Sequence, residues 1–291
     1  MFSGSYVALV TPFKNNRVDV EKLKELVEFH VEKGTSGIAP CGTTGESATL
    51  SHEEHRLVIE TVVKAVRGRI KVIAGTGSNN TTEAIELTRF ANEVGADGCL
   101  VITPYYNKPT QNGLYLHFKK VSEAVDVPIV MYNVPGRTGV NMLPSTVAKL
   151  AKIENIVGLK EASGDISQVS QIVRECGEDF DVLSGDDAMT FPILAVGGKG
   201  VISVAANIVP EALAGLVEAF NRGDIKKARE MHLKMFPLFG AMFYETNPIP
   251  VKTAMSLMGM ISDEIRLPLC KMSEENLTKL KTTLKEYRLI S

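Results

Sequence analysis

One pattern repeats along most of the chain: a short apolar run rich in β-branched residues is followed by an amphipathic segment with helical spacing. Strands that alternate with helices in this way pair in parallel through right-handed crossovers. The chain contains eight such runs, which read YVALVTP, SGIAPCG, KVIAGTG, GCLVITP, PIVMYNV, IVGLKEA, DVLSGDD and GVISVAA. Eight units in a chain of 291 residues predict a closed (β/α)8 TIM barrel.

The helical segments carry their own start signals. Between residues 20 and 31 apolar side chains recur on one helical face, and Asp19 precedes them as the expected N-cap. Ser51 and Glu54 have the spacing of a capping box, which predicts that the next helix begins directly after Ser51.

An open doubly wound sheet is the alternative architecture. It would require a glycine-rich dinucleotide loop after the first strand. Here the first strand is followed by Thr11, Pro12 and Phe13, so the sequence favours the barrel.

Helices without intervening strands are expected at the C-terminal end of the chain, around residues 224–243, 250–261 and 273–287. We therefore expect a catalytic barrel over residues 1–223 and a small helical domain over residues 224–291.

Composition excludes several classes of partner. The formal net charge is −2, so no electrostatic reason exists to expect nucleic acid or an anionic membrane surface. The longest apolar runs are as short as strands and predict no membrane span. The N-terminal stretch MFSGSYVALVTPF lacks a basic region and a cleavage site, and we interpret it as the first strand.

The chain has four cysteines, none in a CxxC spacing: Cys41, Cys99, Cys176 and Cys270. This usage indicates reduced thiols in a cytoplasmic protein. The five histidines fall in helical or helix-entry segments. They assemble no convergent ligand set, so we expect no catalytic metal.

The chemistry of a TIM barrel lies at the C-terminal ends of its strands. In this chain those positions are rich in hydroxyl groups and hold one amine. They are Thr11, Thr43, Thr44, Thr76, Tyr105, Tyr106, Tyr132, Asn133, Lys160, Glu161, Gly185, Asp186 and Ser203.

Lys160 is the amine, and apolar or glycine residues precede it in IVGLK. In a partly apolar barrel mouth the pKa of an ammonium falls, and the neutral amine becomes available. A neutral amine attacks a carbonyl carbon and forms a Schiff base, from which an enamine can form. The alternative is a structural ion pair between Lys160 and Glu161, or another carboxylate, at the barrel rim.

Tyr132 ends the strand before that of Lys160 and should be its neighbour. Its hydroxyl can transfer protons during imine formation, in a relay with Thr43 and Tyr106. The alternative is a tyrosine that only closes the rim of the barrel.

Two features suit carboxylate groups. The glycines around Thr43 and Thr44 indicate a tight turn with exposed N–H groups, although an ordinary βα turn would look the same. Arg137, on the loop after the Tyr132 strand, can bind a second carboxylate bidentately or be a solvated surface residue.

At these positions the sequence resembles the pyruvate-dependent class I aldolases of the N-acetylneuraminate lyase superfamily, and within it the dihydrodipicolinate synthase family. The resemblance covers essentially the whole chain. Its motifs are GTTGES at 42–47, AGTGSN at 74–79, TPYYNKPTQ at 103–111, YNVPGRTG at 132–139, GLKEASGD at 158–165, LSGDD at 183–187, GVISV at 200–204 and NPIPVK at 247–252.

The resemblance implies a reaction and a role for each site residue. Pyruvate would form an imine with Lys160 and condense with L-aspartate 4-semialdehyde, opening the diaminopimelate and lysine pathway, without metal or organic cofactor. Tyr132, Thr43 and Tyr106 would relay protons, with Tyr106 supplied by a neighbouring subunit of a homotetramer, a dimer of dimers. The other implied residues bind substrate: Thr44 with Thr43 through N–H groups, Arg137 at the second substrate, and Gly185 and Ile202 along the pocket.

Some synthases of this family bind L-lysine as an inhibitor at a dimer interface. The matching positions here are Ser47, Ala48, His52, His55, Asn79, Glu83 and Tyr105. His52 and His55 stand one helical turn apart and can face the same ligand. The residue types alone favour surface groups at helix starts that need no ligand, and the match to the family's positions is what favours lysine binding.

Two other functions remain open from the sequence. Another aldolase of the superfamily would keep the imine and change the aldehyde, although Arg137 in GRTG favours a small acidic aldehyde. A non-catalytic keto-acid sensor would have no need of Lys160. Pro40 lies inside the second expected strand, where its missing N–H predicts a bulge or an early end and affects the placement of Thr43.

Overall fold

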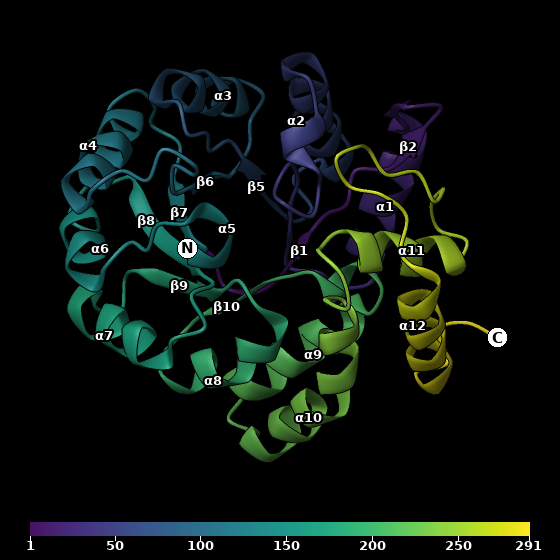
Figure 1. Cartoon of the computed structure of the whole chain (residues 1–291). Helices are drawn as coiled ribbons and strands as arrows, with labels where there is room; N and C mark the ends of the chain where they lie inside the picture. Colours follow the sequence, from purple (N-terminus) through teal and green to yellow (C-terminus); the bar gives the residue numbers. More distant parts are fainter.

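The computed structural model describes residues 1–291, and eight parallel strands in it close into a barrel in the order β1-β10-β9-β8-β7-β6-β5-β4 (Figure 1). Their bounds are β1 Gly4–Ala8, β4 Gly37–Ala39, β5 Lys71–Gly75, β6 Gly98–Ile102, β7 Ile129–Asn133, β8 Ile156–Glu161, β9 Asp181–Ser184 and β10 Gly200–Ser203. All eight expected runs form strands, and the predicted TIM barrel is confirmed.

Helices surround the barrel (Figure 1). They are α1 Val20–Glu32, α2 His52–Val66, α3 Thr81–Glu93, α4 Gln111–Ser122, α5 Pro135–Thr138, α6 Pro144–Leu150, α7 Ile166–Cys176, α8 Thr190–Ala195 and α9 Pro210–Asn221. Short 3-10 turns are η1 Ser47–Thr49, η2 Asp187–Met189 and η3 Ala205–Asn207. No helix combines the length and the apolar character that a membrane crossing demands.

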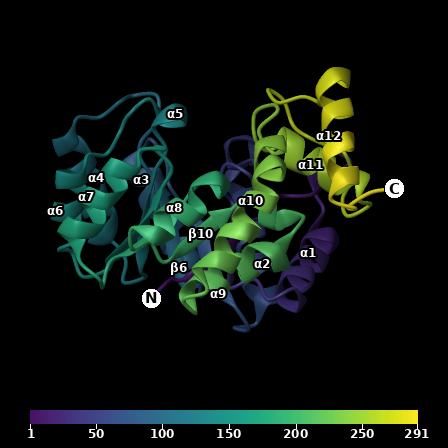
Figure 2. The same ribbon diagram turned by 90° about the horizontal axis from the view of Figure 1, so that it is seen from below.

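Three helices follow at the C-terminal end, where the sequence predicts them: α10 Ile225–Ala241, α11 Ile249–Leu257 and α12 Glu274–Glu286. Figure 2 shows α11 and α12 on the same side of the barrel as α1. Helix α10 packs against α9 and α12, and α11 packs against α12.

Both predicted caps are present. The Asp19 side chain accepts a hydrogen bond from the Lys22 N–H, and Ser51 and Glu54 form the full capping box. One buried cluster fills the barrel interior and includes Tyr6 and Ile202, whereas a larger one packs the outer faces of the strands against the helices.

The second barrel strand is short, as expected from Pro40. Strand β4 ends at Ala39, the Pro40 carbonyl accepts a hydrogen bond from the Gly75 N–H at 2.9 Å, and Cys41 has a positive φ of 55°. The chain therefore turns away early and begins the loop that carries Thr43.

A small hairpin after β1 was not predicted. Strands β2 Phe13–Lys14 and β3 Arg17–Val18 pair in antiparallel fashion. Asn15 and Asn16 join them with φ of 53° and 58°, a conformation that asparagine adopts more readily than most residues. The Asn-Asn pair was the available signal.

Closure of the barrel depends on a close approach between β10 and β1. A Cβ on Gly200 would lie 2.0 Å from the carbonyl oxygen of Gly4, so Gly200→Ala must push the two strands apart. We expect it to lower stability by about 1–3 kcal/mol or more, measured by denaturant unfolding. Gly240→Ala in α10 is the control: no heavy atom lies within 4 Å of the added Cβ, and it should be neutral or stabilise by up to about 1 kcal/mol. Equal stability of the two variants would contradict this account of closure.

Candidate active site

Lys160 and Tyr132 end neighbouring strands and are direct register partners of β8 and β7. The Lys160 Nζ lies 4.4 Å from the centre of the Tyr132 ring. Both side chains are buried, with Lys160 only 6% exposed. They line a cavity of about 130 Å³ at the C-terminal ends of the strands.

This cavity collects most of the predicted catalytic and substrate-binding residues. Those that line it are Thr43, Thr44, Tyr132, Arg137, Lys160, Gly185 and Ile202. They come from β7, β8 and β10, from α5, and from the loops after β4 and β9. Residues more than a hundred positions apart therefore meet at one face of the barrel, as parallel closure requires.

The pKa of Lys160 is lowered to about 8, mainly because the side chain is buried. The negative charge of Asp187 raises this pKa and the positive charge of Arg137 lowers it, but both effects are smaller than that of burial. About a tenth of the Lys160 side chain is therefore neutral at pH 7, far more than for a lysine with the ordinary pKa of about 10.4. No ion pair joins Lys160 to a carboxylate. Glu161 instead accepts hydrogen bonds from Asn133, Gln168 and the Ser163 N–H, so the alternative of a Lys160–Glu161 pair is not seen.

Gly185 leaves space for the lysine side chain. A Cβ at this position would lie 3.1 Å from the Lys160 Cε and 2.8 Å from the Ala162 Cβ. A larger residue would press on the methylene chain that carries the amine, so the glycine leaves room for that chain.

The loop after β4 lines the cavity with two residues whose N–H groups have no acceptor in the chain. Residues 42–47 form a tight turn, in which the Gly45 N–H donates to the Gly42 carbonyl at 3.1 Å and the Glu46 N–H donates to the Thr43 carbonyl at 3.1 Å. The N–H groups of Thr43 and Thr44 donate to no acceptor within the chain. Consecutive free N–H groups in a turn form a binding site for an anion such as a carboxylate.

Asn247 connects the turn at Thr43 and Thr44 to Arg137. Its side-chain Nδ2 donates to the Thr44 hydroxyl at 3.0 Å, and its carbonyl oxygen accepts from the Arg137 guanidinium at 3.2 Å. Burial raises the pKa of Tyr132, whereas Arg137 and a hydrogen bond with Thr43 lower it. The phenol is thus protonated near neutral pH, and it lines the same cavity as Thr43, the first partner of the expected relay.

Tyr106 lies away from this cavity. Its side chain is 88% exposed, and its backbone has a positive φ of 72°. A single chain does not bring it to Lys160, so its expected place in a relay depends on another subunit.

A second and larger cavity, of about 580 Å³, adjoins the first and shares Thr43, Tyr132, Arg137 and Asn247 with it. Of the residues matched to lysine binding, Ser47, Ala48, His52, His55, Glu83 and Tyr105 line this cavity, and Asn79 does not.

Glu83 is one of the charged residues that line this second cavity, where it accepts from the Ser78 hydroxyl and lies 3.1 Å from the His52 Nε2. The His55 Nε2 lies 2.7 Å from the Gly75 carbonyl oxygen. Burial lowers the pKa of His55, so this ring is neutral near pH 7.

Two residues of the site were missed from the sequence. Asn247 lies between α10 and α11, where an inspection of strand ends does not reach, although it begins the NPIPVK motif. Asp187 begins η2 in LSGDD; its Oδ2 accepts from the Ala205 and Val204 N–H groups at 2.8 and 3.1 Å. Burial raises the pKa of Asp187 to about 6.

No group of three or more His, Cys, Asp or Glu side chains is placed to hold a metal ion. The arrangement is a buried amine, a neighbouring phenol, a turn with two free N–H groups and a guanidinium group. Such a site can form an imine with a keto acid and hold a second acidic substrate.

Comparison with known proteins shows the family to which this chain is similar. The family model of the dihydrodipicolinate synthetase family matches residues 1–287. A 4-hydroxy-tetrahydrodipicolinate synthase of Syntrophus aciditrophicus is 60% identical over 290 residues, which cover 100% of each chain.

Solved structures give the same result. Dihydrodipicolinate synthase from Aquifex aeolicus is 56% identical, with a TM-score of 0.98 and 99% of each chain covered. The chloride-inhibited synthase from Acinetobacter baumannii complexed with pyruvate is 45% identical, with a TM-score of 0.98 and 100% of each chain covered. The synthase from Cyanidioschyzon merolae with lysine bound is 42% identical, with a TM-score of 0.97 and 99% of each chain covered. With a barrel, a buried strand-end lysine and full-length similarity all in agreement, this chain belongs to the dihydrodipicolinate synthetase family.

Proposed function

We propose that this chain condenses pyruvate with L-aspartate 4-semialdehyde to give 4-hydroxy-tetrahydrodipicolinate, the first committed step of the diaminopimelate and lysine pathway. The observation that carries the proposal is the Lys160 amine, buried without a carboxylate partner in a cavity lined by Tyr132, Thr43 and Arg137. The relatives that match the full length of the chain carry the corresponding name.

The chemistry follows from the amine. Neutral Lys160 attacks the keto carbon of pyruvate, and loss of water from the carbinolamine gives a protonated imine. Loss of a methyl proton gives the enamine, whose carbon attacks the aldehyde carbon of the semialdehyde. Attack of the product's own amine on the imine carbon then closes the ring and releases Lys160. Tyr132 relays the protons of these steps with Thr43.

Binding of the two substrates is divided between the two carboxylate-binding elements. The free N–H groups of Thr43 and Thr44 hold the pyruvate carboxylate, while Arg137 holds the carboxylate of the semialdehyde. Gly185 and Ile202 line the pocket around the imine.

We also propose the division of the chain into a catalytic barrel over residues 1–223 and a helical domain over 224–291. The helical domain reaches the site through Asn247, which contacts Thr44 and Arg137. The four cysteines are free, which supports the reducing cytoplasm as the place of the reaction.

The test is a coupled assay with pyruvate and L-aspartate 4-semialdehyde, run beside pyruvate with N-acetylmannosamine. We expect turnover with the semialdehyde and none with the sugar. Turnover with the sugar alone would identify a different aldolase of the superfamily. Binding of pyruvate without turnover of either aldehyde would favour a sensor.

Removal of the Tyr132 hydroxyl tests the relay. Tyr132→Phe keeps the buried ring and should lower kcat by about 10²–10⁴-fold with a small change in KM, because a general acid–base group is lost. Steady-state kinetics with both substrates measure it. Activity near that of the wild type would mean that Tyr132 only packs.

The lowered pKa of Lys160 predicts a pH dependence. Because only the neutral amine attacks, kcat/KM for pyruvate should rise with pH and level off above about 8. Asp187→Asn removes a charge that raises this pKa, so the midpoint should move to lower pH. A wild-type midpoint near the ordinary lysine value of about 10.4 would contradict the proposed environment.

We propose a homotetramer, a dimer of dimers, in which Tyr106 enters the site of a neighbouring subunit. Exposure of 88% for Tyr106 and 39% for Tyr105 supports an interface at this surface. Sedimentation with an activity assay tests it, and a fully active monomer would contradict it.

L-Lysine is the proposed feedback inhibitor, bound in the larger cavity with its ammonium at Glu83. A family relative has been solved with lysine bound. Added L-lysine should lower the activity of the wild type but not of Glu83→Ala, which has lost the carboxylate. Unchanged wild-type activity at millimolar lysine, or inhibition that persists in Glu83→Ala, would remove this site and leave the catalytic proposal intact.

A further inference from the structure

Two charged residues in the motifs GTTGES and NPIPVK have no part in the chemistry described so far. Glu46 and Lys252 form an ion pair whose side chains are 0% and 3% exposed. Glu46 ends the loop that presents Thr43 and Thr44, and Lys252 lies in α11, five residues after Asn247. The pair therefore joins the C-terminal helices to the loop of the proposed pyruvate carboxylate site.

The other oxygen of Glu46 is also satisfied. Its Oε2 accepts a hydrogen bond from the backbone N–H of Arg266 at 3.1 Å. The Lys252 Nζ and the Arg266 guanidinium lie 4.3 and 4.2 Å from the centre of the Phe13 ring, so one aromatic ring contacts both cations.

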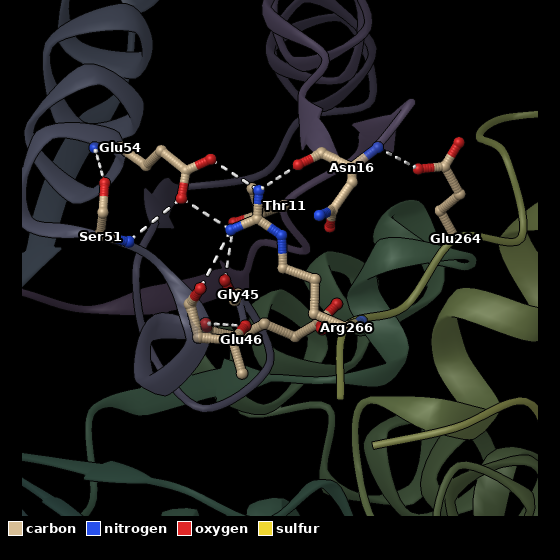
Figure 3. A network of polar contacts seen from close by, with 9 residues as sticks. Thr11, Asn16, Gly45, Glu46, Ser51, Glu54, Glu264 and Arg266 are labelled. Atoms are coloured by element: carbon tan, nitrogen blue, oxygen red, sulfur yellow. Dashed lines mark hydrogen bonds and ion pairs between the residues drawn. The ribbon is translucent and has the colours of Figure 1, made fainter. Parts of the chain in front are cut away.

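Arg266 extends the contacts outward from this pair. Its guanidinium donates to both carboxylate oxygens of Glu54 at 2.6 Å and to the Asn16 carbonyl at 2.7 Å (Figure 3). The Glu264 carboxylate accepts from the Asn16 N–H at 2.9 Å (Figure 3). The segment around Arg266, whose N–H group binds Glu46, is thus itself fixed to α2 and to the β2–β3 hairpin.

The loop needs such support because its backbone is strained at both ends. Cys41 and Glu46 have positive φ of 55° and 52°, a region that residues other than glycine occupy only where their surroundings hold them. The Thr11 hydroxyl donates to the Gly45 carbonyl at 2.7 Å and fixes the loop from β1 (Figure 3). The Glu46 carboxylate fixes it from the opposite side.

A buried ion pair is a costly way to gain stability, because two apolar side chains of similar size often stabilise a fold as well or better. A charged pair with a second hydrogen bond does, however, favour one position of the carboxylate over others. At Glu46 that position fixes the end of the loop that carries Thr43 and Thr44.

We propose that Glu46 and Lys252 are positioning residues, which hold the loop 41–46 against α11 so that the Thr43 and Thr44 N–H groups meet the pyruvate carboxylate. This inference rests on the proposed function. It makes the C-terminal helices part of the pyruvate site, although Lys252 touches no substrate.

The test compares the wild type with Lys252→Met and with the double variant Glu46→Gln/Lys252→Met. Lys252→Met leaves a buried carboxylate unpaired and should destabilise the fold, whereas the double variant removes both charges and should keep it. In the double variant we expect kcat/KM for pyruvate to fall by about 10²-fold, mostly through KM, because a small displacement of a binding group has effects of this size.

The second substrate provides the internal control. Arg137 contacts the Asn247 carbonyl, and Asn247 reaches the loop only through its side-chain bond to the Thr44 hydroxyl, so KM for L-aspartate 4-semialdehyde should change much less than KM for pyruvate. A loss of folded protein would instead lower kcat and leave the KM of both substrates unchanged. The exposed pair Glu275–Lys279 on α12 gives the matched variant Glu275→Gln/Lys279→Met, which should change neither constant.

Each outcome decides the proposal. A folded double variant with the pyruvate KM of the wild type overturns it. A double variant that does not fold assigns the pair to stability and overturns it as well. A wild type without pyruvate turnover would instead refute the proposed function, so the two failures are distinguishable.

Discussion

The burial of one amine constrains the rest of this structure. Lys160 loses its hydration at the C-terminal end of β8, and no carboxylate replaces that hydration with an ion pair. Nearby carboxylates are engaged elsewhere: Glu161 by Asn133, Gln168 and Ser163, and Asp187 by two backbone N–H groups. A direct pair with either one would stabilise the ammonium and remove the nucleophile. The polar network around Lys160 therefore holds the Asp187 carboxylate close enough to raise the pKa of the lysine somewhat, but too far away to form an ion pair with it.

A reactive amine alone gives no selectivity, and the surrounding elements supply it. Parallel closure brings Tyr132 beside Lys160, and the early end of β4 at Ala39 frees the next residues to form a tight loop with N–H groups toward the cavity. Asn247, from the far end of the chain, connects that loop to Arg137. The cavity is therefore a product of the barrel and of the segment that follows it.

The sequence predicted the features that depend on local patterns. The strands, the helices and the caps at Asp19 and Ser51 follow from apolar periodicity and side-chain spacing. Lys160, Tyr132 and Thr43 could be selected because a closed parallel barrel places all strand ends on one face. The role of Pro40 in ending β4 was likewise a local effect.

Contacts between distant segments could not be predicted in this way. Asn247 meets Thr44, and Lys252 meets Glu46, across about two hundred residues of chain, and neither pairing leaves a periodic signal. Asp187 looks like its neighbour Asp186 in sequence, and only the fold shows that one is buried against backbone N–H groups. Tyr106 is exposed on the single chain, so its proposed place in the relay rests on the resemblance and not on a contact in this structure. The most direct measurement of the central claim is borohydride reduction in the presence of pyruvate, followed by peptide mapping. A pyruvate-derived adduct on the peptide that carries Lys160 is the expected result, and an adduct on another lysine, or none in an active preparation, would contradict the account.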